Sequence, residues 1–330
     1  MSVFTGVKVA PKTINIINVP SDIGSIHAGK SRAPAAFKSA GLHKKLEAEG
    51  LRVTESTALL EGSGRWVSST REPNGARNEA KTVSACHQVQ KSVSAALGYK
   101  DGKKKTIVFQ LILGGECLYC PPIMSAYWQH FEGSNGRLGI IYVDADCHLA
   151  TPAESDSTGN ISGMTLTHLT LREDALESME AFCRPDGSPV VDCNNIALFG
   201  LNMDSPTNKR SHLGYLLDNS FHVTTSRTIQ QSPIEEAEAA LAWLDDRVDV
   251  FLVHLDVGVI DSGQFPLGNV PSYSGLGFEE TLAAVQTFLR SSKVIGLSIA
   301  EVNPDHDPGL KMTEQLVDKL VVGLAARTKS

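Results

Sequence analysis

The chain has 330 residues, of which 42% are hydrophobic, and a formal net charge of −7. This length can bury a large core, and the interspersed acidic balance excludes the basic footprint of proteins that bind nucleic acid or anionic membranes. The six cysteines favour free thiols over a disulfide framework. Residues 1–6 lack the basic and apolar regions of a signal peptide, and no uncharged apolar run is long enough for a membrane span. We therefore expect a cytoplasmic enzyme.

Strand-like apolar runs alternate with amphipathic helical patterns along the whole chain. The predicted strands are, in chain order, 14–19, 106–113, 140–143, 196–199, 250–255 and 294–299. The predicted helices are 34–49, 83–97, 233–246, 279–289 and 312–326. This alternation indicates one α/β domain over residues 1–330, with a parallel sheet covered by helices on both faces. The stretches 60–80 and 150–163 are interpreted as active-site loops.

Side chains that can bind a metal gather where two of the predicted strands end. Asp144, Asp146 and His148 occur at alternate positions at the end of the β-rich run 138–144, so in an extended chain they point the same way. His254 and Asp256 share a face at the end of another strand. Ligands of open α/β sheets bind at the carboxyl ends of the strands. Because clustered buried carboxylates are costly unless something binds there, the sequence predicts a site at this edge.

Four segments, in the same order, resemble the ureohydrolases, the family of arginase, agmatinase and formimidoylglutamase. The matching segments are Gly114-Gly-Glu-Cys117 for the family's Gly-Gly-Asp-His, Asp144-Ala-Asp-Cys-His148 for Asp-Ala-His-x-Asp, Asp256-Val-Gly-Val-Ile-Asp261 for Asp-x-Asp-x-x-Asp, and Glu301-Val-Asn-Pro304 for Glu-Val-Asn-Pro. The resemblance implies a three-layer α/β/α fold with a mostly parallel, eight-stranded sheet. It also implies a small-molecule substrate and a homo-oligomer, either a trimer or a hexamer.

The resemblance further implies two Mn(II) ions held by two His and four Asp side chains, and this chain departs from that set. Cys117 and Asp146 stand where the family has His, His148 stands for an Asp, and Gly258 stands for the last Asp. Glycine supplies no ligand, and a thiolate with an imidazole suits zinc better than manganese. We therefore expect one divalent ion, with zinc favoured and manganese or iron as alternatives. The candidate ligands are Cys117, Asp144, Asp146, His148 and Asp256.

Two alternatives to a metal site remain open. A family member that has lost a ligand can be a metal-free protein with a binding or regulatory role and no hydrolase activity. In the second alternative, Cys117 is a nucleophile assisted by His148 or His254. That alternative requires a lowered thiol pKa, whereas the nearby carboxylates would raise it.

The predicted substrate-side residues also come from the resemblance. Ser162 stands where the family has a proton-shuttling His, and Thr158 and Asn160 lie on the loop to which arginase assigns carboxylate binding. Glu301 matches the residue that holds the guanidinium, so we expect it to bind a cationic group. We expect Asp146 or His254 to act as the base. The predicted function is hydrolysis of a non-peptide C–N bond in a small guanidine, amidine, ureido or amide compound, without efficient arginase activity.

Overall fold

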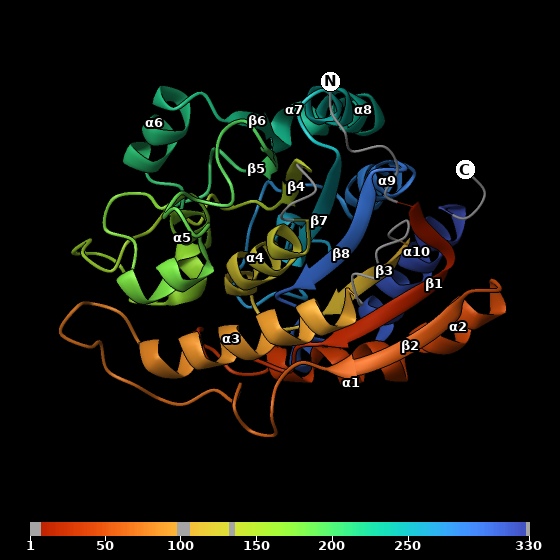
Figure 1. Cartoon of the computed structure of the whole chain (residues 1–330), viewed down its shortest axis with the longest axis horizontal. Helices are drawn as coiled ribbons and strands as arrows, with labels where there is room; N and C mark the ends of the chain where they lie inside the picture. Colours follow the sequence, from red (N-terminus) through yellow and green to blue (C-terminus); the bar gives the residue numbers. More distant parts are fainter. Residues whose placement is uncertain (1–7, 98–105, 132–135, 328–330) are drawn as a thin grey trace.

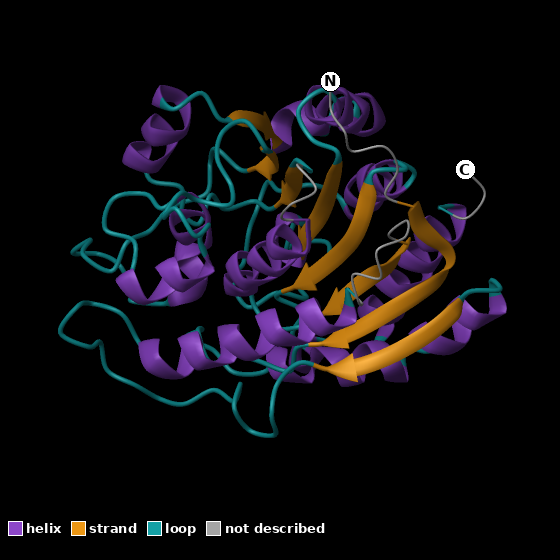
Figure 2. Cartoon of the chain, in the orientation of Figure 1, coloured by secondary structure: helices purple, strands orange, loops and turns teal. Residues whose placement is uncertain are grey.

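The computed structural model describes residues 8–97, 106–131 and 136–327, so the N-terminal residues discussed above lie outside the described part. Within it, eight strands form one sheet of order β2-β1-β3-β8-β7-β4-β5-β6, with parallel pairings throughout (Figures 1 and 2). The strands are β1 (Lys8–Asn18), β2 (Arg52–Thr57), β3 (Thr106–Leu113), β4 (Leu138–Val143), β5 (Ile196–Leu201), β6 (His222–Thr225), β7 (Val250–Asp256) and β8 (Val294–Ala300). The α-helices are α1 (Ala33–Ser39), α2 (Leu42–Ala48), α3 (Glu79–Ala96), α4 (Cys120–Phe131), α5 (Thr165–Thr170), α6 (Arg210–Asp218), α7 (Ser226–Ile229), α8 (Pro233–Asp245), α9 (Phe278–Leu289) and α10 (Lys311–Ala326).

Helices cover both faces of this sheet. Ile16 packs in a buried cluster with residues of α1, α2, α8, α9 and α10, whereas its neighbour Ile17 packs with residues of α3, α4 and α5. Successive strand residues belong to opposite clusters because side chains alternate across a strand. The three-layer α/β/α prediction is confirmed. No helix of the described part is long and apolar enough to cross a membrane.

The elements differ from the periodicity-based prediction at two edge strands, at one predicted helix, and at the short helices α5, α6 and α7, which were not predicted. β2 and β6 were missed because both lie at an edge of the sheet, where β2 is largely exposed and β6 has only four residues. The helix predicted over 34–49 is two helices, α1 and α2, because Gly41 adopts a left-handed φ of 84° between them. The one continuous sheet supports the single-domain organisation, which stays a prediction.

The four resembling segments fall at the carboxyl ends of four neighbouring strands. β3, β8, β7 and β4 are adjacent in the sheet, although they are far apart in sequence. Because their carboxyl ends reach the same edge, the residues that end or follow them are brought together. This edge positions the candidate site.

Candidate metal centre and its cavity

Four side chains with metal-binding groups meet at this edge. Asp144 follows β4, Asp256 is the last residue of β7, and Cys117 opens a short 3-10 helix, η2 (Cys117–Tyr119), after β3. His148 has a φ of 46°, which is uncommon for a residue other than glycine. One ligand atom from each of these four described residues lies within 4.8 Å of the others. A spacing of this kind suits one cation.

Protons balance part of the negative charge in this cluster. Asp144 Oδ2 lies 3.2 Å from His148 Nδ1. Burial lowers the pKa of His148, but the charge and hydrogen bond of Asp144, together with the charges of Asp146 and Asp256, outweigh burial and raise the pKa to about 10. Burial, together with the charge of Asp144, raises the pKa of Asp256 well above its usual range. Metal ligands must be deprotonated, so binding a cation here would release protons.

The surroundings of Cys117 argue against its acting as a nucleophile. Its thiol donates to Asp256 Oδ2 at 3.0 Å and faces His254 Nε2 at 3.3 Å. Burial and the charge of Asp256 raise the thiol pKa well above its usual range. Burial also lowers the pKa of His254 to about 3, and His254 Nδ1 pairs with Ser298 Oγ at 2.9 Å. A neutral buried imidazole is a weak base for activating such a thiol.

The second metal position that the resemblance implies lacks the ligand at residue 258 in this chain. Gly258 has no side chain, and its N–H donates to Asp256 Oδ1 at 2.6 Å. Asp146 Oδ1 accepts hydrogen bonds from Ser205, at 3.1 Å, and from Thr207. Asp146 is not part of the group of four described residues. The residues present therefore fit one ion and do not fit a second.

A cavity of about 530 Å³ opens beside the cluster, with Asp144, His148 and Asp256 in its wall. The 150–163 loop lines this cavity. Its three predicted substrate-side residues, Thr158, Asn160 and Ser162, are all part of the cavity wall. Described residues of the 60–80 stretch do not line this cavity, which corrects their interpretation as an active-site loop. Instead, Arg77 Nε donates to the carbonyl oxygen of Thr158 at 2.7 Å, so the stretch supports the loop that does.

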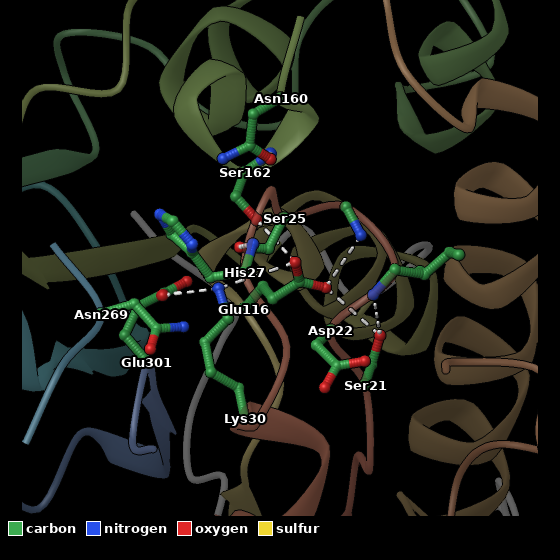
Figure 3. Close-up of polar contacts among 12 residues, drawn as sticks. Ser21, Asp22, Ser25, His27, Lys30, Glu116, Asn160, Ser162, Asn269 and Glu301 are labelled. Carbon is green, nitrogen blue, oxygen red and sulfur yellow. Dashed lines mark hydrogen bonds and ion pairs between the residues drawn. The ribbon is translucent and has the colours of Figure 1, made fainter. Parts of the chain in front are cut away.

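A buried ion pair forms another part of the cavity wall. Lys30 begins the 3-10 helix η1 (Lys30–Arg32), and its Nζ lies 2.7 Å from Glu301 Oε2 and 3.7 Å from Glu116 Oε1 (Figure 3). Ser162 Oγ donates to Glu116 Oε1 at 3.1 Å. Burial raises the pKa of Glu116 to about 7, although Lys30 lowers it. Glu301, which we expected to bind a cationic substrate group, is already paired inside the protein.

Sequence reasoning missed three residues of the site. The Tyr142 hydroxyl lies 2.8 Å from His148 Nδ1, and strand alternation could have identified it because Tyr142 and Asp144 are two apart. Ser298 lies opposite His254 in the β7–β8 register, which required knowledge of the strand order. Lys30 carried no signal, since lysines are almost never fully buried unless paired.

Comparisons with known proteins agree with this geometry. The sequence model of the Arginase family matches residues 12–326 of the chain. The arginase of Staphylococcus aureus strain MRSA252 is 30% identical over 308 residues, which are 93% of this chain and 95% of the relative. The chain belongs to the arginase family.

Solved structures extend the comparison to the fold. The Entamoeba histolytica arginase in complex with L-ornithine superposes with a TM-score of 0.79 at 19% identity, covering 95% of this chain and 98% of that one. The formimidoylglutamase of Bacillus subtilis gives a TM-score of 0.68 at 20% identity, covering 99% and 89%. At these identities the structures show the shared fold. Family membership makes the chain an arginase-superfamily hydrolase at a coarse level and leaves its substrate and metal as proposals.

Proposed function

We propose that this chain hydrolyses a non-peptide C–N bond in a small guanidine, amidine, ureido or amide compound, with one divalent ion in place of a manganese pair. The observation that carries the proposal is the group of four donors, Cys117, Asp144, His148 and Asp256, within 4.8 Å of one another. A thiolate, an imidazole and carboxylates form a set that zinc prefers to manganese. By family resemblance we also propose a homo-oligomer, and from the composition a cytoplasmic one. Because Ser162 replaces the family's proton-shuttling His, we propose that it is not an efficient arginase.

The protein residues have separate roles in this proposal. A bound divalent ion supplies a water of lowered pKa. Asp146 lines the cavity, and the hydroxyls of Ser205 and Thr207 both donate to its Oδ1, so Oδ2 is the atom that would accept a proton. His254, which is fully buried between Ser298 and Cys117, would position the thiolate and not act as the base. Thr158, Asn160 and Ser162 would contact the substrate from the loop.

Metal content is the test of this proposal. We expect purified protein that is equilibrated with zinc, iron and manganese together and then dialysed to retain at most one ion per chain, with zinc or iron exceeding manganese. Asp256→Asn should retain none after dialysis, because a neutral amide oxygen is a much weaker ligand than the carboxylate it replaces in this group of four. The variant should keep its fold, since Asn is nearly isosteric and removes a buried charge. Elemental analysis and circular dichroism measure both properties.

Two manganese ions per chain would overturn the proposal, and so would an Asp256→Asn variant that keeps its metal. If the wild-type protein retains no ion of any kind, the metal-free binding or regulatory protein is the better account.

A further inference from the structure

The loop that carries Lys30 is fixed in place on both sides. Asp22 Oδ2 accepts hydrogen bonds from the Gly29 N–H at 2.9 Å and from the Ser31 hydroxyl at 2.8 Å. Gly29 has a φ of 121°, and a Cβ at this position would lie 2.2 Å from Asn303 Oδ1, so the backbone is pressed against that side chain. These contacts therefore fix the backbone position of Lys30. The side chain of Lys30 is 2% exposed there and ends at Glu301 (Figure 3).

The ammonium of Lys30 stays charged in this position. Burial lowers its pKa, but the charges of Glu301 and Glu116 outweigh burial and raise the pKa above its ordinary value. A cationic ligand that took Glu301 would place its own charge beside this buried ammonium. Bringing like charges together away from solvent costs free energy, and leaving a buried ion without its partner also costs free energy.

The other carboxylates in the cavity wall are also satisfied inside the protein. The partners are His148 for Asp144 at 3.2 Å, Lys209 for Asp156 at 2.5 Å, Cys117 for Asp256 at 3.0 Å, and the hydroxyls of Ser205 and Thr207 for Asp146. Among the described residues that line the cavity, no carboxylate lacks an internal partner. Of these carboxylates, Asp146 accepts only from neutral hydroxyls and keeps its charge, whereas Glu301 is already held by the ammonium of Lys30. A guanidinium or amidinium at Glu301 would therefore have to displace that ammonium.

A buried hydrogen-bond donor without a partner lies in the same wall. Asn269 lines the cavity, and its Nδ2 atom is buried with no hydrogen-bond partner among the described residues. The amide orientation follows from a chain of hydrogen bonds that starts at the backbone. Asn303 Oδ1 accepts from the Asp305 N–H at 3.0 Å, so Asn303 Nδ2 donates to Asn269 Oδ1 at 2.6 Å, which leaves the NH₂ group of Asn269 as a donor without a partner among the described residues. Figure 3 draws Asn269 together with Glu301 and Lys30, and all three line the cavity.

We infer that Lys30 and Asn269 select an uncharged carbonyl group, the C=O of a ureido or carboxamide compound, and exclude guanidinium and amidinium groups. An ammonium has three donors, of which Glu301 takes one, and the Asn269 NH₂ adds more. Donors of this kind suit an oxygen with lone pairs, whereas a guanidinium is donor-only. The inference rests on the proposed function and narrows its substrate class.

The test compares ligands that differ only at this group. Citrulline and arginine form one such pair, and butylurea and butylguanidine form another that needs no amino-acid contacts. Binding is measured by calorimetry on zinc-loaded protein. We expect wild type to bind the ureido member at least about tenfold more tightly. Lys30→Met, which frees Glu301, should lower this preference by at least about tenfold through a gain in guanidinium affinity.

Two further variants make the result specific. Asn269→Ala changes no charge, and it should weaken ureido binding about tenfold without changing guanidinium binding. Lys45→Met removes an ammonium that pairs with Asp318 at 2.6 Å outside the cavity, and it should change neither affinity. If Lys30→Met does not fold, the wild-type preference and the Asn269→Ala result decide the question.

Three results would overturn the inference. In the first, wild type binds the guanidinium member as tightly as the ureido member, or more tightly. In the second, the preference for the ureido member is unchanged in both Lys30→Met and Asn269→Ala. In the third, neither wild type nor either variant binds either member. Metal content is measured on the same samples. If wild type prefers the ureido member but holds no metal, the hydrolase proposal is refuted and this inference stands. If the protein holds one ion but both variants keep the wild-type preference, this inference is refuted and the hydrolase proposal stands.

Discussion

Gly258 lies two residues after Asp256 and has no positive φ, so aspartate can adopt its backbone conformation. A Cβ at this position would lie 3.0 Å from Asp256 Oδ1, the movable end of a side chain. We expect Gly258→Asp to raise the manganese content from at most one ion towards two per chain, because it restores a carboxylate where the second ion lacks a ligand. Elemental analysis after dialysis measures the change.

The control for this variant is Gly268→Asp, which adds the same charge to the same cavity wall. A Cβ at position 268 has its nearest neighbour at 3.8 Å, so the substitution is accommodated there as well. If Gly268→Asp raises the metal content equally, added charge and not ligand geometry is responsible. If neither variant binds a second ion, the glycine is not what limits this site to one.

Single residues also show how far sequence could predict the site. Asp144, His148 and Asp256 were found because strand alternation and the resembling motifs place ligand types at strand ends, and the structure brings them together with Cys117. The internal pairing of Glu301 could not be found, because Lys30 reaches it from a loop 271 positions away in the chain. No local pattern marks such a contact, since it depends on how the β1–α1 connection crosses the end of β8.

At the scale of elements, the same limit separates central from edge strands. The six apolar runs were recognised because a strand buried on both faces is apolar throughout, whereas β2 and β6 had no such run. Short helices were equally hard to predict, and α5 is one that matters for the site. The backbone N–H groups of Leu166 and Thr167 donate to the His148 carbonyl oxygen at 3.1 and 3.4 Å, so α5 holds a candidate ligand in its left-handed conformation.

His168 makes α5 sensitive to acid. The imidazole is buried, neither ring nitrogen has a hydrogen-bond partner among the described residues, and burial lowers its pKa from 6.5 to about 3. Between these two values the unfolded chain binds a proton that the folded chain does not, so stability falls as pH falls below about 6.5. We expect the change from pH 7 to pH 5 to cost wild type about 2 kcal/mol more than His168→Leu, measured by urea unfolding.

The matched control is His306→Leu, which removes an exposed histidine. Its loss of stability between pH 7 and pH 5 should equal that of wild type. A His168→Leu variant with the wild-type pH dependence would show that His168 is protonated as readily in the folded protein as in the unfolded chain.

For the whole molecule, the position of the candidate ligands links metal binding to folding. Cys117, Asp144 and Asp256 belong to segments around three different strands, so the cluster exists only while the sheet is intact. A ligand that binds only the folded state stabilises it by about 1.4 kcal/mol for each tenfold rise in concentration above Kd. Unfolding entropies of about 2.1 cal/mol/K per residue convert this into roughly 2 °C per tenfold for a chain of this length. We therefore expect Tm to rise by about 2 °C for each tenfold increase in free zinc above Kd.

Scanning calorimetry over several decades of buffered zinc measures this slope, and Asp256→Asn provides the comparison. The variant should show a Tm independent of zinc, because an ion at this edge must contact the carboxylate that ends β7. An equal slope in the variant would place the zinc elsewhere on the molecule. A wild-type Tm that does not respond to zinc, iron or manganese would leave the cluster as a proton-sharing structural feature, with Cys117 donating to Asp256 and His148 paired with Asp144.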